Sequence, residues 1–190
     1  KVKDGFLFLN LSATDNLHRV VHTNDRGEVQ QSYLPSEMSL DMIYNEISFV
    51  RDKNGEVYIF PPFSNAIYRW TSEGPKPVFR TDFGKNAAEE DVKSSYDITE
   101  SGKAFNTGFF IVDNHLVNRF FHSGKNYYSL YDMEKGTQHI ITPDTSEFIP
   151  FAPQWQSAKG LIGYILTTDY DKWKPQKDSC DAALFVFHLK

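Results

Sequence analysis

The sequence predicts an all-β protein, and three observations lead to this class. Apolar residues alternate with polar ones along short runs, as they do in strands that bury one face. β-branched and aromatic residues dominate these runs, and Gly, Asn, Asp and Pro separate them. A helical period of apolar residues is hard to find. We therefore expect short antiparallel strands joined by tight turns.

The expected strands follow one another closely along the chain. In the first half they lie at residues 5–11, 17–23, 29–34, 47–51, 56–60, 66–71 and 77–81. In the second half they lie at residues 107–112, 116–122, 127–132, 138–142, 160–167 and 183–189. Glycines at positions 27, 55, 74, 124 and 136 belong to the turns between strands, where a positive φ favours glycine. Only residues 87–95 are expected to be a short helical or flexible insertion.

A repeated unit narrows the class to a β-propeller. Three segments share a strand, a glycine turn and a second strand, and their turn glycines are Gly27, Gly74 and Gly136. Two of these segments are preceded by another expected strand pair, so the unit has about four strands. With one insertion, its length fits the roughly 40 to 50 residues of a propeller blade. A two-sheet sandwich with similar hairpins is the alternative.

The repeat predicts one partial propeller domain over residues 1–190 with four-stranded antiparallel blades. The approximate blades are residues 1–39, 40–84, 96–142 and 148–190, of which the first is partial and the last partial or distorted. That amounts to three to four blades, whereas closed propellers usually have four to eight. The chain is therefore a compact four-bladed ring or part of a larger one, and we expect the larger ring.

Composition excludes several classes of protein. The net charge is -5 and no run of Lys or Arg is longer than a pair, so we expect no nucleic-acid partner. The longest apolar stretches, residues 6–11 and 184–189, are far shorter than the roughly 20 residues that cross a bilayer, so we expect no transmembrane segment. Cys180 is the only cysteine, so an internal disulfide or a cysteine-based metal site is excluded.

Residues 44–84 resemble the six-bladed β-propeller proteins abundant in Bacteroides and its relatives. The matching residues are Phe63-Ser64-Asn65, Ile67-Tyr68-Arg69, Gly74 and Asp82-Phe83-Gly84. Residues 5–35 and 105–142 fit more loosely, and residues 184–190 resemble the closing strand of that family. The resemblance implies a secreted, often lipid-anchored protein of the cell envelope, loosely related to NHL-type propellers, whose biochemical role is mostly undefined.

The resemblance also implies about six blades, which this chain is too short to supply. We therefore expect it to be the C-terminal portion of a longer protein whose missing N-terminus carries the anchor. Exposed blade edges need a cover. The partners expected at these edges are the missing blades or another copy of the chain.

Catalytic and metal-binding patterns are absent from the sequence. The histidines show no known metal-ligand spacing, and His18 and His22 would lie about 13 Å apart on one strand. An axial metal would have to take one loop ligand from each blade, as His115 and Asp169 could provide. Neither a Gly-x-Ser-x-Gly nucleophile motif nor a phosphate-binding glycine loop occurs. We therefore assign no catalytic residue, metal ligand or cofactor.

Four residues are candidates for ligand binding. Trp155, Tyr170 and Trp173 lie in a polar region rich in loop signals, where aromatic faces suit a sugar or a peptide. Arg51 ends an expected inner strand, from which its guanidinium would reach a carboxylate in the central channel. The structural alternatives are packing between blades for the aromatic residues and an ion pair for Arg51. Other aromatic residues are expected in the core, namely Trp70, Phe109, Phe110, Phe120 and Phe121.

These observations favour a binding or scaffold module outside the cytoplasm, with a periplasmic or cell-surface location. Its ligand would be a glycan or a peptide, bound at the loop face or in the central channel. The alternative is a hydrolase or lyase with a metal ion on the central axis, as in some six-bladed propellers. A third possibility is assembly, in which the open edges pair with another chain.

Overall fold

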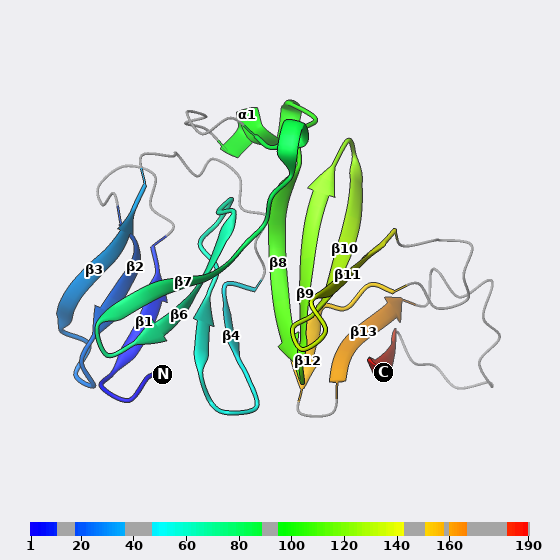
Figure 1. Cartoon of the computed structure of the whole chain (residues 1–190). Coiled ribbons are helices and arrows are strands. Elements are labelled where there is room, and N and C mark those ends of the chain that lie inside the picture. The colour runs from blue at the N-terminus through cyan, green and yellow to red at the C-terminus, as the bar shows by residue number, and fades with distance from the viewer. Residues whose placement is uncertain are drawn as a thin grey trace.

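The chain forms four antiparallel sheets that follow one another in chain order. They are seen in a computed structural model that describes residues 1–10, 18–36, 47–88, 95–142, 151–157, 160–166 and 182–189. Within each sheet, strands that are consecutive in sequence are also hydrogen-bonded neighbours. The sheets stand side by side, from the blue first sheet to the orange and red last one (Figure 1).

The two middle sheets have four strands each, and the two end sheets have three. The first sheet contains β1 (Phe6–Leu9), β2 (His18–Thr23) and β3 (Val29–Pro35). The second contains β4 (Phe49–Arg51), β5 (Val57–Ile59), β6 (Ala66–Thr71) and β7 (Gly74–Arg80). The third contains β8 (Phe105–Val112), β9 (His115–His122), β10 (Lys125–Asp132) and β11 (Thr137–Ile141). The fourth contains β12 (Trp155–Ser157), β13 (Gly160–Leu166) and β14 (Ala182–Phe187).

Every strand expected from the sequence is present within a few residues of its expected bounds. The turns also have the expected chemistry. Ser123 and Gly124 connect β9 to β10 with φ values of 47° and 79°, the two positive values of a type I′ hairpin turn. The turn glycines at positions 27, 55, 74 and 136 have positive φ as well. The exception among the strands is β12, which the sequence did not predict.

The segment 87–95, expected to be a short helical or flexible insertion, is described only at residues 87, 88 and 95. A short 3-10 turn, η1 (Gly84–Asn86), ends at Ala87, which is extended and forms an isolated bridge with Ala104. Helix α1 (Ser95–Glu100) begins only at the end of the predicted segment, and residues 89–94 lie outside the described residues. Ile98 holds α1 in place by packing against Phe63 and Phe105.

Apolar clusters fill the spaces between neighbouring sheets. Between the second and third sheets, Phe60 and Phe109 meet edge to face with ring centroids 5.9 Å apart. Between the third and fourth sheets, the Phe151 ring lies 5.2 Å from both Tyr128 and Phe187. Strand β8 is buried along its whole length because its sheet is covered on both faces. Among the residues expected in the core, Phe109 and Phe110 are almost fully buried on its two faces.

The first and second sheets meet through a smaller aromatic contact. The Trp70 ring lies 5.1 Å from His22 and 5.4 Å from Tyr33, centroid to centroid. Gly74 also belongs to this contact, because a Cβ there would lie 2.5 Å from the Tyr33 ring. The expected structural role of Trp70 between two sheets is therefore what the structure shows.

Candidate functional site

The first strands of all four sheets border one cleft. Its volume is about 990 Å³, and its lining comes from β4, β8, β12 and the last residue of β1, Leu9. The deeper wall is apolar and includes Val50 and Phe110, whereas the rim is polar. The polar rim consists of Arg51, Asp52, Lys53, Asp113 and Gln156. Because β1, β4, β8 and β12 all border this cleft, we call them the inner strands.

Arg51 and Trp155, two of the four predicted binding residues, both line this cleft. They are far apart in sequence and come from β4 and β12, so the arrangement of the sheets brings them to one cavity. Tyr170 and Trp173, the other two, lie outside the described residues, as does most of the loop that was expected to carry them.

Arg51 ends β4 with an exposed side chain held by two carbonyl groups. Its Nη1 donates to the Gly55 carbonyl oxygen and its Nη2 to that of Lys1, each at 2.5 Å. The adjoining turn is rigid because the Asp52 carboxylate accepts hydrogen bonds from the backbone N–H groups of Asn54 and Glu56, both at 2.9 Å. The guanidinium is thus fixed at the rim, and its remaining N–H groups suit a carboxylate ligand.

Gln156 links three of the inner strands, and sequence reasoning missed it. From β12, its Oε1 accepts a hydrogen bond from the Ile111 backbone N–H of β8 at 2.9 Å. Its Nε2 donates to the Arg51 carbonyl oxygen of β4, also at 2.9 Å. No sequence signal distinguishes this glutamine from a surface residue, because its role depends on which backbone groups the neighbouring sheets bring near it.

Trp155 presents an aromatic surface at the edge of the cleft. Its side chain is half exposed, and its ring stacks on that of Tyr164 with centroids 5.6 Å apart and an interplanar angle of 29°. The sequence had placed Trp155 in a loop region, but it is the first residue of β12. Strand geometry therefore fixes the ring instead of leaving it on a loop.

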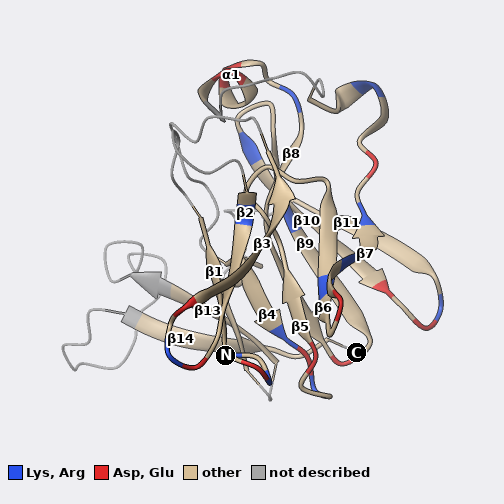
Figure 2. Ribbon diagram, turned by 90° about the vertical axis from the view of Figure 1, so that its left-hand side faces the viewer, with Lys and Arg blue, Asp and Glu red and all other residues tan. Residues whose placement is uncertain are grey.

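The charges at the rim have both signs. Lys53 lies next to Asp52 in the β4–β5 turn, and its Nζ donates to Asn114 Oδ1 at 3.4 Å. Figure 2 shows acidic and basic positions close together in the turns below β4 and β5. Asp113 adds a second acidic group from the β8–β9 turn. Such a mixed rim offers cationic side chains to an acidic group of a ligand and carboxylate and amide side chains to its hydroxyl groups.

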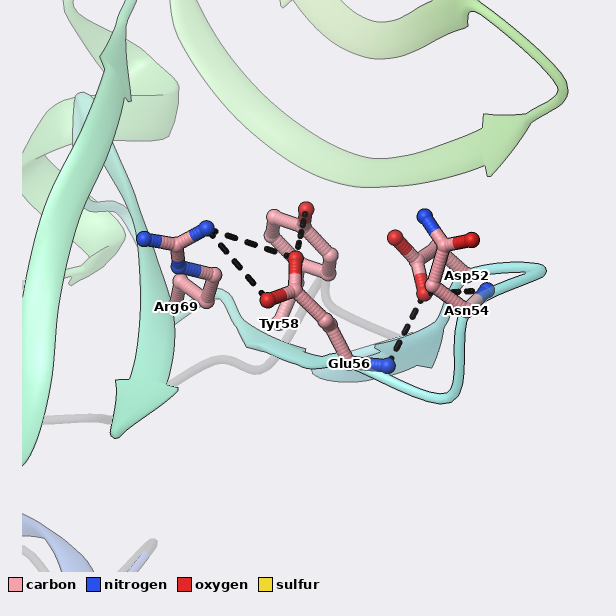
Figure 3. A network of polar contacts seen from close by, with 5 residues as sticks. All are labelled: Asp52, Asn54, Glu56, Tyr58 and Arg69. Atoms are coloured by element: carbon pink, nitrogen blue, oxygen red, sulfur yellow. Dashed lines mark hydrogen bonds and ion pairs between the residues drawn. The ribbon is translucent and has the colours of Figure 1, made fainter. Parts of the chain in front are cut away.

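A polar network lies beside the rim on the second sheet (Figure 3). Arg69 Nη1 lies 3.3 Å from Glu56 Oε2, and the Tyr58 hydroxyl donates to the same carboxylate at 3.3 Å. Burial, together with the negative charges of Asp52 and Glu56, raises the pKa of Tyr58 to about 12. The phenol is therefore protonated at neutral pH, and the network joins strands of one sheet instead of supplying a general base.

Two of the histidines contact residues that are not candidate metal ligands on their own. His115 Nε2 lies 3.9 Å from Asp132 Oδ2, where β9 begins and β10 ends, and His22 packs on Trp70. Within the described ranges, no group of three His, Cys, Asp or Glu residues is close enough together to hold a metal ion. Asp169, the other position considered for an axial metal, is not among the described residues.

The contacts of the Asp132 carboxylate predict how the stability of the third sheet depends on pH. Its carboxylate lies 2.9 Å from Lys135 Nζ and accepts backbone hydrogen bonds from Lys135 and Glu134, and these contacts lower its pKa from 3.8 to about 2. Because the pKa is lower in the folded state, the stabilisation is present above about pH 4 and is lost as the pH falls towards 2. We expect Asp132→Asn to melt at a lower temperature than wild type at pH 5.

The difference between the two melting temperatures should shrink between pH 5 and pH 2.5, as measured by circular dichroism. Equal differences at both values would show that the Asp132 carboxylate does not carry this acid sensitivity. Glu73→Gln is a suitable comparison, since the exposed carboxylate of Glu73 is paired with Lys76 in another sheet.

Comparisons with known proteins identify the fold. A crystal structure of a Bacteroides fragilis protein predicted to be exported matches with a TM-score of 0.68 at 12% identity. The match covers 87% of this chain and 52% of the other, so the chain spans about half the length of that structure. No curated protein matches the chain. Among the described helices, none has the length and apolar character needed to cross a membrane.

A family comparison agrees with the four antiparallel sheets. Residues 3–149 match DUF5128, described as a 6-bladed beta-propeller. The all-β propeller class predicted from the sequence is confirmed, and the two-sheet sandwich is wrong. The chain belongs to this family of six-bladed β-propellers.

Proposed function

We propose that the chain is part of a non-enzymatic binding module that holds a glycan in the cleft between its inner strands. The observation that carries the proposal is that Arg51 and Trp155 border the same cleft. An exposed indole ring offers an apolar face to a sugar, and a fixed guanidinium offers directed hydrogen bonds to a carboxylate or hydroxyl group. The cleft has a volume within the range of small-ligand sites.

A glycan is favoured over a peptide by the way the inner strands use their backbone groups. A peptide that adds to a sheet needs a run of free N–H and C=O groups along one edge. Here the Ile111 N–H and the Arg51 carbonyl are already bonded to Gln156, which interrupts such a run on two strands. Side-chain donors and acceptors at the rim serve a sugar without requiring that edge.

The proposed location is outside the cytoplasm, in the periplasm or at the cell surface. It is supported by the structural similarity to a protein predicted to be exported and by the resemblance to lipid-anchored envelope propellers. Fractionation of the native cells, with an antibody against the chain, tests it directly. Recovery in the cytoplasmic fraction would contradict this part of the proposal.

Binding is tested with trigalacturonate, an acidic sugar trimer, and with cellotriose as a neutral one. We expect trigalacturonate to bind, and Arg51→Ala to raise its Kd by about tenfold or more, since a hydrogen bond to a charged group contributes about 1.5–3 kcal/mol. Trp155→Ala should weaken the binding of both sugars because it removes the ring that they share. Isothermal titration calorimetry measures all four combinations.

Arg69→Ala is the matched control, because Arg69 is a half-exposed arginine of the same sheet that does not line the cleft. Its Kd should equal that of wild type, and thermal melting should show that every variant is folded. Binding of triglutamate but of neither sugar would show that the cleft takes a peptide and not a glycan. Shortened sugars after incubation with the protein would contradict a non-enzymatic binding module and would support the alternative, a hydrolase or lyase. No binding of any probe would contradict the proposal.

A further inference from the structure

Residues 1–5 form a tight turn just before β1, and we call it the N-terminal turn. The Val2 N–H donates to the Gly5 carbonyl oxygen at 2.8 Å, and the Gly5 N–H donates back to the Val2 carbonyl oxygen at 3.4 Å. Val2 is buried, whereas the Lys1 and Asp25 side chains, which form an ion pair at 3.6 Å, are mostly exposed. An exposed ion pair contributes little to stability, so the burial of Val2 does more to hold the turn in place.

Gly5 fits closely against the end of β2. Its φ is 136°, in the region that favours glycine, and a Cβ there would lie 1.8 Å from the Thr23 carbonyl oxygen. Gly27, in the β2–β3 turn, also has a positive φ, but a Cβ there would have open space around it. A side chain at position 5 must therefore displace the N-terminal turn or the end of β2, whereas one at position 27 displaces nothing.

The N-terminal turn is bonded to Arg51 at the rim of the cleft. Arg51 Nη2 donates to the Lys1 carbonyl oxygen, and its Nη1 donates to the Gly55 carbonyl oxygen of its own sheet. Because the two acceptors belong to different parts of the fold, the plane of the guanidinium is fixed only while the N-terminal turn keeps its place. With the Gly55 carbonyl alone, the guanidinium would pivot about a single hydrogen bond.

We propose that the N-terminal turn positions Arg51 for an acidic ligand of the cleft, which makes Val2 and Gly5 positioning residues of this site. The proposal rests on the proposed function for the identity of the ligand. A long side chain that binds a ligand loses rotamer freedom, and this loss opposes binding. The two carbonyl groups remove much of that freedom before the ligand arrives. The turn thus strengthens the binding of a carboxylate, although neither Val2 nor Gly5 lines the cleft.

Gly5→Ala tests the proposal, and Gly27→Ala is the matched control. We expect Gly5→Ala to raise the Kd of trigalacturonate about three- to tenfold, the effect of having to order one long side chain on binding. The Kd of cellotriose should change less than about twofold, because a neutral sugar has no carboxylate for Arg51. In an Arg51→Ala background, Gly5→Ala should have no further effect on either Kd, since the turn acts through the guanidinium. Gly27→Ala should leave both values unchanged.

NMR of the isotope-labelled protein tests the same contact without sugar. Hydrogen-bonded N–H groups exchange slowly with water, and the guanidinium signals of Arg51 are those that disappear in Arg51→Lys. We expect these signals in the wild type and in Gly27→Ala, and their loss through fast exchange in Gly5→Ala. Val2→Ala removes the buried side chain of the turn and should have the same effect, so it replaces Gly5→Ala if that variant does not fold.

Unchanged Arg51 signals in a folded Gly5→Ala or Val2→Ala variant would overturn the proposal. Equal rises in the Kd of both sugars would also overturn it, because they would show a general effect on the fold. If the wild type binds neither sugar, the proposed function fails, and the guanidinium signals alone decide whether the N-terminal turn holds Arg51. The two proposals therefore fail separately.

Discussion

Replacing Phe109 by alanine is expected to lower the free energy of unfolding by about 3–5 kcal/mol. The side chain is fully buried between the second and third sheets, where its ring meets that of Phe60 edge to face. Strand β8 is covered on both faces, so the surrounding residues have little freedom to collapse into the space that the ring leaves. The loss therefore includes both the transfer of the ring to water and a cavity.

Urea unfolding followed by circular dichroism measures this difference. Phe8→Ala is the matched control in the chain of residues 1–190, because Phe8 is a half-exposed phenylalanine on β1 of the first sheet. We expect its cost to stay below about 1 kcal/mol. A similarly small cost for Phe109→Ala would show that the second and third sheets are not packed on each other through this ring.

Replacing Asn106 by leucine is expected to cost about 2–4 kcal/mol, although leucine has a similar size. Asn106 is almost fully buried, and its Nδ2 donates to the Ser64 carbonyl oxygen at 2.9 Å across the interface between two sheets. Its Oδ1 accepts a hydrogen bond from Asn118 Nδ2 at 2.7 Å. Leucine would leave the half-buried Ser64 carbonyl and the buried Asn118 Nδ2 without these hydrogen bonds.

Asn126→Leu is the control for this prediction, since Asn126 is an exposed asparagine on β10 of the same sheet. Its effect should lie within about 0.5 kcal/mol of zero. If Asn106→Leu unfolds at the wild-type urea concentration, the hydrogen bonds of Asn106 do not contribute net stability. A double variant with Asn118→Leu then measures whether the two side chains are coupled.

The strands could be predicted from the sequence because the patterns that mark them lie within a few consecutive residues. Alternation with a period of two and glycine turns sufficed for β2, β6 and β9, whose bounds agree with expectation to within a residue. Strand β12 was missed because two of its three residues are polar and it begins two residues after Pro153. The equally short β4 and β5 were found because β-branched and aromatic residues dominate them. Ala87, at the start of the segment expected to be helical or flexible, is extended and pairs with Ala104, a contact with a distant residue that the local pattern does not contain.

The candidate site was predicted only in part for the same reason. Arg51 was found because it ends a strand that the repeat places innermost, and the structure puts it at the rim of the cleft. Gln156 was not found, since its two hydrogen-bond partners come from other sheets. Whether Arg51 and Trp155 bind a ligand remains a prediction that the titrations above test.

The consecutive order of strands within each sheet has a consequence for folding kinetics. Because every paired strand of the second and third sheets follows its neighbour after a short connection, the loops that must close to form these two sheets have a small entropic cost. Each sheet can therefore begin as a hairpin without waiting for the others. The third sheet, with three strands of eight residues, offers the longest local hairpins and the surface on which both neighbours condense. Folding should thus begin in the third sheet and spread to its neighbours. The first and fourth sheets should be the last to order and the first to open.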